Sequence, residues 1–139
     1  MSSTWLEVRL GAGLAAVRVV NDLLDVALRA AFVDELTRHD TTLAVAELVT
    51  NVVEHERPAL GDRAEVSIRV DVGDAELVVI VTSPGAGYDV ERHIAEARER
   101  TTLEESTEGG MGLLILASLF DVKAGKVPSG HQILLRRAL

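Results

Sequence analysis

The chain has 139 residues, 47% of them hydrophobic and 26% charged, which suits one compact domain with a core of ordinary size. Its formal net charge of -8 argues against a nucleic-acid partner, because affinity for a phosphate backbone comes from clustered Lys and Arg. The absence of Cys excludes disulfides and thiolate metal sites, and the sequence contains neither a membrane span nor a secretory signal. We therefore expect a single cytoplasmic domain over residues 1–139 that does not bind a membrane.

The first part of the chain predicts one strand followed by helices. The segment TWLEVRLG alternates apolar and polar side chains and ends at a glycine, as a short strand does. An Ala-, Val- and Leu-rich pattern from residue 14 to about residue 33 predicts a helix, which VDELTRHD (residues 33–40) either extends or follows as a separate turn. A second helix is predicted over residues 42–56, before a Pro and a Gly. Its candidate N-caps are Asp40, Thr41 and Thr42.

The middle of the chain predicts a hairpin. Residues 64–72, AEVSIRVDV, alternate apolar and polar side chains, and a Gly-Asp turn separates them from the apolar run LVVIV at residues 77–81. Because this second strand is apolar on both faces, we expect it to lie in the centre of a sheet.

The last part predicts helices and a second hairpin. A charged helix over residues 90–100 precedes a polar, Gly- and Thr-rich segment, and LLILASLF predicts a buried helix that the glycines open. The segments DVKAGKV and HQILLRRAL predict the final hairpin. Strand pairs joined by tight turns favour an α/β (α+β) two-layer sandwich, with a mixed, mostly antiparallel sheet and helices on one face. Strict strand-helix alternation is missing, which disfavours a Rossmann fold.

The stretch ELVTNVVEH carries polar residues at helical spacing inside an apolar helix. Glu47, Asn51 and His55 follow Ala44 on one strip, while the opposite strip is apolar. An exposed strip usually carries Lys, Arg and scattered Glu, whereas this one is narrow and rich in acceptors. An ordinary exposed strip stays open as an alternative, and a lone His on a helix more often has a packing role than a catalytic one.

Two glycine-containing segments follow. SPGAGYD comes directly after the central strand, where a ligand can approach the backbone, although for a lone G-x-G a simple turn is the better explanation. GGMGL runs into a helix, and a helix N-terminus exposes free backbone N–H groups that accommodate phosphate. Together with a carboxylate and an amide on one helix face, these segments suggest a site for magnesium, a base and phosphates.

In this order, ELVTNVVEH, TSPGAGYD and GGMGLLILASLFD resemble the N box and the two glycine boxes of the GHKL ATP-binding (Bergerat) fold. Within this family the chain is most similar to bacterial anti-sigma-factor serine/threonine kinases, because of its short length, its ELVTN motif and its last segment, SGHQILLRRAL. The resemblance implies that Glu47 accepts the proton of the attacking serine hydroxyl and that Asn51 ligates magnesium. It also implies nucleotide contacts of the two glycine boxes. These residues are Ser83, Gly85, Gly87, Gly110, Gly112 and Leu113.

Two positions depart from the family. The first glycine box normally begins with an Asp that accepts from the adenine amino group, and here it begins with Ser83. In the last strand a Thr commonly follows the glycine, and here His131 does. A hydrogen bond to a charged group contributes about 1.5–3 kcal/mol, or roughly 10- to 150-fold in affinity, so adenine binding is expected to be weakened or altered.

The resemblance thus implies an anti-sigma-factor-like kinase that uses ATP and magnesium to phosphorylate an anti-anti-sigma antagonist protein and that binds a sigma factor. The alternative is a non-enzymatic regulatory protein-binding module with a degenerate adenine pocket, and whether the chain is an enzyme stays open between the two. Kinases of this group often form dimers, and the apolar residues 10–20 are candidates for a homodimer contact. A Ser-His-Asp hydrolase is disfavoured because SPGAG has no nucleophile between its glycines.

Overall fold

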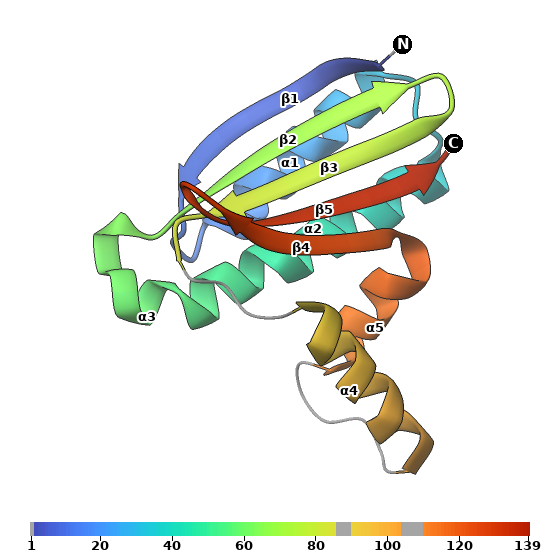
Figure 1. Ribbon diagram of the computed structural model, residues 1–139. Coiled ribbons are helices and arrows are strands. Elements are labelled where there is room, and N and C mark those ends of the chain that lie inside the picture. Colours follow the sequence, from blue (N-terminus) through green and yellow to red (C-terminus); the bar gives the residue numbers. More distant parts are fainter. Residues whose placement is uncertain (1, 86–89, 104–109) are drawn as a thin grey trace.

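The protein forms a five-stranded antiparallel sheet. The structure, a computed structural model, describes residues 2–85, 90–103 and 110–139 (Figure 1). In the described part of the chain the strands have the spatial order β1-β2-β3-β5-β4, and every neighbouring pair is antiparallel. The strands are β1 (Ser2–Gly11), β2 (Glu65–Gly73), β3 (Glu76–Ser83), β4 (Asp121–Val127) and β5 (Gly130–Ala138).

The helices form a second layer on one side of the sheet. Helices α1 and α2 run beneath the strands, whereas α4 and α5 lie together beyond the β4 edge (Figure 1). The helices are α1 (Ala16–Ala30), α2 (Glu35–His55), α4 (Val90–Leu103) and α5 (Gly110–Leu119), with a short α3 (Arg57–Leu60) and a 3-10 turn (Gly61–Arg63) after α2. The predicted two-layer sandwich is confirmed, with a sheet that is antiparallel throughout the described strands. None of the described helices combines the length and apolarity that crossing a bilayer requires.

Strand β3 lies in the middle of the sheet, as its apolar run predicted. It pairs with β2 on one side and β5 on the other, so both of its edges are hydrogen-bonded. Leu77, Val79 and Val81 alternate along it and are buried against the helices. The same alternation places Ser83, the last residue of β3, on the helix-facing side.

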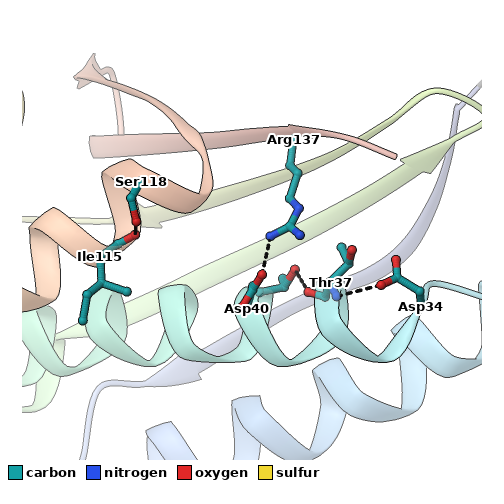
Figure 2. Close-up of polar contacts among 7 residues, drawn as sticks. Asp34, Thr37, Asp40, Ile115, Ser118 and Arg137 are labelled. Carbon is teal, nitrogen blue, oxygen red and sulfur yellow. Dashed lines mark hydrogen bonds and ion pairs between the residues drawn. The ribbon is translucent and has the colours of Figure 1, made fainter.

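Helix α2 begins seven residues earlier than residue 42, so the predicted N-caps are wrong. Asp34 caps the helix, because its carboxylate accepts a hydrogen bond from the Thr37 backbone N–H at 3.1 Å (Figure 2). Thr41 is buried inside α2, where its hydroxyl donates to the Thr37 carbonyl oxygen at 2.7 Å. Residues 35–41 therefore belong to α2 and neither extend α1 nor form a separate turn.

An ion pair ties the first half of α2 to the sheet. The guanidinium of Arg137 on β5 donates to the Asp40 carboxylate at 2.6 Å (Figure 2). Only 19% and 11% of the two side chains are exposed, and the guanidinium also lies 5.7 Å from the centre of the Phe120 ring. An ion pair with so little solvent exposure favours one position of α2, because moving either partner would leave a charge without its counterion. It thereby helps to position Glu47 and Asn51, which lie about two and three turns further along α2.

Candidate functional site

Glu47 lies against the second glycine segment. It is half-buried on α2, on the side that packs against α5. A Cβ added to Gly112 would lie 2.6 Å from Glu47 Oε2 and still closer to the other carboxyl atoms. The backbone of Gly112 therefore touches the carboxylate directly, and a larger residue at this position would displace it. The helix segment that carries Glu47 and the glycine segment that carries Gly112 are far apart in the sequence, and they contact each other here.

The pKa of the Glu47 carboxyl is raised above its ordinary value. Partial burial is the larger cause, because it disfavours the charged form, and the negative charge of Glu54 two turns later adds to it. A carboxylate with a raised pKa is a stronger base. A carboxylate in this position can accept a proton more readily than an exposed glutamate can.

Asn51 follows Glu47 one turn later on α2. The two residues are about 6 Å apart along the helix axis. Asn51 is half-buried, and its amide oxygen is a ligand type that magnesium accepts. Within the described residues, no three His, Cys, Asp or Glu side chains gather closely enough to hold a metal ion among themselves. A magnesium ion here would combine the amide with oxygens from a ligand or water, as magnesium usually does.

The polar strip predicted on α2 is only partly correct. Ala44, predicted on this strip, is buried with 2% exposure in the core. Glu47 and Asn51 are half-buried, and His55 is exposed at the last residue of α2. The strip passes from the interior at one end to the surface at the other, because α5 covers only part of it.

The second glycine segment forms the start of α5. Gly110 is the first residue of the helix and Gly112 follows it within the first turn. The first turn of a helix has backbone N–H groups without helical partners, and the helix dipole places partial positive charge there. Leu113 is 4% exposed and packs into the core, so its side chain anchors this end of α5.

The first glycine segment lies at the end of β3. Ser83 pairs with His131 of β5, and the two side chains are 5% and 7% exposed. Gly130 has a φ of 142°, and a Cβ there would lie 2.6 Å from Pro84 Cα, so only glycine fits. This close approach brings His131 beside Ser83. Gly85 follows in the described chain, whereas Gly87 lies outside the described residues.

Sequence reasoning missed Glu56, which meets both Ser83 and Gly85. The Ser83 hydroxyl donates to Glu56 Oε2 at 2.7 Å, and the Gly85 backbone N–H donates to Oε1 at 2.7 Å. Glu56 is the C-cap of α2. The signal for it was indirect: a serine at the end of a buried strand needs a hydrogen-bond partner, but nothing in the spacing pointed to this one.

The comparisons with known proteins agree with this arrangement. The family model of the histidine kinase-like ATPase domain matches residues 10–137. The chain belongs to this family. The match covers most of the chain and includes α2, the end of β3 and the start of α5. The resemblance to the GHKL ATP-binding fold is therefore confirmed.

Curated relatives of this histidine kinase-like ATPase domain are serine-protein kinases named RsbW. The protein from Bacillus licheniformis is 28% identical over 103 residues, and that from Bacillus subtilis 31% identical over 103 residues. Each alignment covers 72% of this chain and 64% of the relative, so the chain spans less than two thirds of the length of these Bacillus proteins. The Staphylococcus epidermidis protein is 25% identical over 126 residues, covering 87% of this chain and 79% of that protein.

A solved structure shares the fold at low identity. A chain in the crystal structure of the SiaB-SiaC complex from Pseudomonas aeruginosa superposes with a TM-score of 0.64. The superposition covers 98% of this chain and 91% of that one, with 16% sequence identity. This likeness concerns the fold alone.

Proposed function

We propose that this chain is an anti-sigma-factor-like serine/threonine protein kinase. It uses ATP and magnesium to phosphorylate a serine or threonine of an antagonist protein, and it binds a sigma factor. The family assignment and the relatives named serine-protein kinase support this proposal. The observation that carries it is the half-buried carboxylate of Glu47, held against Gly112 at the start of α5.

The residues at this place fit a triphosphate and its metal. We call Glu47, Asn51, Gly110 and Gly112 the phosphate end of the site. Gly112 leaves no space between its own backbone and the Glu47 carboxylate, and the first turn of α5 supplies free N–H donors for phosphate oxygens. The amide of Asn51 would hold magnesium. ATP supplies the phosphoryl group that is transferred.

The residues of the phosphate end divide the chemistry between them. Glu47 accepts the proton of the substrate hydroxyl as this oxygen attacks, and its raised pKa makes it a better acceptor than an exposed glutamate. The N–H groups at the start of α5 stabilise the negative charge of the phosphates, because they are oriented before the ligand arrives. Asn51 would hold the magnesium ion through its amide oxygen, and the ion would supply positive charge against the phosphates.

The partners and the cellular context are part of the same proposal. The antagonist is a small anti-anti-sigma protein that presents the acceptor hydroxyl, and the sigma factor binds a surface near the helices. We place the protein in the cytoplasm as one domain over residues 1–139. The proposal includes a homodimer with residues 10–20 at its interface. Leu14 and Val19 in this segment have exposed side chains.

A nucleotide titration followed by a transfer assay tests the proposal. The protein is titrated with ATP, ADP and GTP in the presence of magnesium, and transfer of labelled γ-phosphate to a candidate antagonist is then measured. We expect binding of an adenine nucleotide below millimolar concentration and magnesium-dependent labelling of a serine or threonine. Failure of every nucleotide to bind at millimolar concentration would exclude the kinase.

The second candidate is a non-enzymatic regulatory module with the same fold. It is favoured by the other end of the site, which we call the base end: Ser83, Gly85, His131 and Glu56. Here the two residues that the family uses to read adenine are replaced, and the Glu56 side chain already contacts the glycine segment. In this case no nucleotide binds, and the sigma factor or the antagonist binds equally well with and without ATP.

A further inference from the structure

The carboxylate of Glu56 is held in one orientation at the base end. Each of its oxygens accepts one hydrogen bond at 2.7 Å, from the Ser83 hydroxyl and from the Gly85 backbone N–H. The two donors come from the last residue of β3 and from the glycine segment, and Ser83 is 5% exposed. A Cβ at Gly85 would lie 2.8 Å from Glu56 Cγ, so the glycine is needed for this contact.

Part of the acceptor capacity of this side chain is unused by its bonds to Ser83 and Gly85. An ionised carboxylate has about four acceptor positions, and the two bonds to Ser83 and Gly85 use two of them. The ion pairs between described residues do not include Glu56. Its two hydrogen-bond partners among the described residues are neutral donors, and they orient the carboxyl group. A further N–H donor that enters this place would meet an acceptor already in position.

We propose that Glu56 is the residue of this chain that reads the base, by accepting a hydrogen bond from the exocyclic amino group of adenine. This inference rests on the proposed function, since it requires a nucleotide whose phosphates lie at the phosphate end. Glu56 and Glu47 are nine residues apart on the same helix, or about 13 Å along its axis. The two carboxylates thus mark separate ends of one elongated site.

The chemistry of a carboxylate selects among purines. Adenine presents an N–H donor at its 6-position, whereas guanine and hypoxanthine present a carbonyl oxygen there. Two facing acceptors repel each other, so a 6-oxopurine loses this hydrogen bond and leaves the remaining acceptor positions of the carboxylate without a donor from the base. Sites built around a hydrogen bond reject analogues that lack it far more strongly than apolar sites reject an altered hydrocarbon.

The test compares ATP with ITP, which differ at the 6-position of the base. Dissociation constants with magnesium are measured for the wild type, for Glu56→Ala and for the matched control Glu54→Ala, which removes an exposed glutamate of α2. We expect the wild type and Glu54→Ala to prefer ATP by roughly 10- to 150-fold, as for a hydrogen bond to a charged group. In Glu56→Ala the preference disappears because ATP affinity falls.

A second variant covers the case in which Glu56→Ala does not fold. In Ser83→Asp/Glu56→Ala the carboxylate moves to the other partner of the same hydrogen bond. We expect this double variant to regain a preference for ATP over ITP. Circular dichroism and thermal melts establish that each variant is folded before its titration.

The possible outcomes separate this inference from the proposed function. If the wild type binds ATP and Glu56→Ala keeps the same preference over ITP, the role of Glu56 is refuted and the kinase proposal stands. If Glu56→Ala binds both nucleotides more tightly, Glu56 blocks the base and does not read it. If the wild type binds neither nucleotide, both proposals fail together.

Discussion

The two ends of the site differ in how closely they keep the pattern of the family. At the phosphate end, Glu47 and Gly112 occupy the expected motifs and touch each other in the fold. At the base end, Ser83 and His131 replace the expected residues, and a carboxylate arrives from Glu56, 27 residues before Ser83 in the chain. A lost side chain can thus be replaced by a group from another element, because recognition depends on the position of the acceptor in space.

The largest expected effect is at the phosphate end. Glu47→Gln keeps the size of the side chain but removes the proton acceptor, so phosphotransfer should fall by about 10²- to 10⁴-fold. The dissociation constant of ATP should stay nearly the same, because the base acts on the substrate hydroxyl. Labelled transfer and nucleotide titration measure the two quantities, with Glu35→Gln at the exposed start of the same helix as control. Full transfer by Glu47→Gln would show that another group accepts the proton.

Gly112→Ala is expected to have the next largest effect. The new Cβ would overlap the Glu47 carboxyl group, which must swing away. A displacement of about 1 Å at a reacting group can cost about 10²-fold in rate. The melting temperature should change little, because a flexible side chain absorbs the overlap. Gly125→Ala on β4 is the control, since nothing lies within 4 Å of its Cβ. Equal transfer rates of the two variants would contradict the contact between Glu47 and Gly112.

A charge added at the base end should destabilise the protein. The sequence alone predicts that Ser83→Asp restores the carboxylate of the family and tightens adenine binding. In the structure the new carboxylate faces Glu56 Oε2 across the present hydrogen bond, so two like charges meet. We expect a loss of about 1–3 kcal/mol in the free energy of unfolding and weaker ATP binding.

A double-mutant cycle measures whether this loss comes from Glu56. Ser83→Asp/Glu56→Ala should recover most of the stability, with a coupling energy of about 0.5–3 kcal/mol in chemical denaturation. If the effects of the two substitutions on stability are additive, the two carboxylates do not interact. The base end would then be independent of Glu56.

The smallest expected effect concerns the pH dependence of stability. The pKa of Glu47 is raised in the folded protein, so the stability it contributes is complete below its ordinary value of 4.5. This contribution is lost as the pH rises through the folded-state pKa. Glu47→Gln has no ionisable group at this position and therefore does not lose stability in this way. Its melting temperature should exceed that of the wild type slightly at neutral pH and not at pH 4. A Tm difference that is constant between pH 4 and 7 would contradict the shift.

Much of the fold followed from the sequence because the patterns behind it are local. Alternation and helical spacing predicted the order of strands and helices, and the apolar run of β3 predicted its central place. The start of α2 was missed because several Asp and Thr residues are equally good caps in sequence. Asp34 caps the helix. Asp40 instead pairs with Arg137 of β5, and the Thr41 hydroxyl bonds to a carbonyl oxygen of α2 itself.

The residue types of the site can be read from the sequence: the carboxylate and the amide one turn apart, the glycines at a strand end and a helix start, and the loss of an acid at Ser83. Which of these residues meet depends on the packing of the elements in three dimensions. Glu47 reaches Gly112 because α5 packs on α2, and Glu56 reaches Ser83 because α2 ends beneath the end of β3. Such contacts depend on how elements distant in sequence pack, and no local periodicity carries that information.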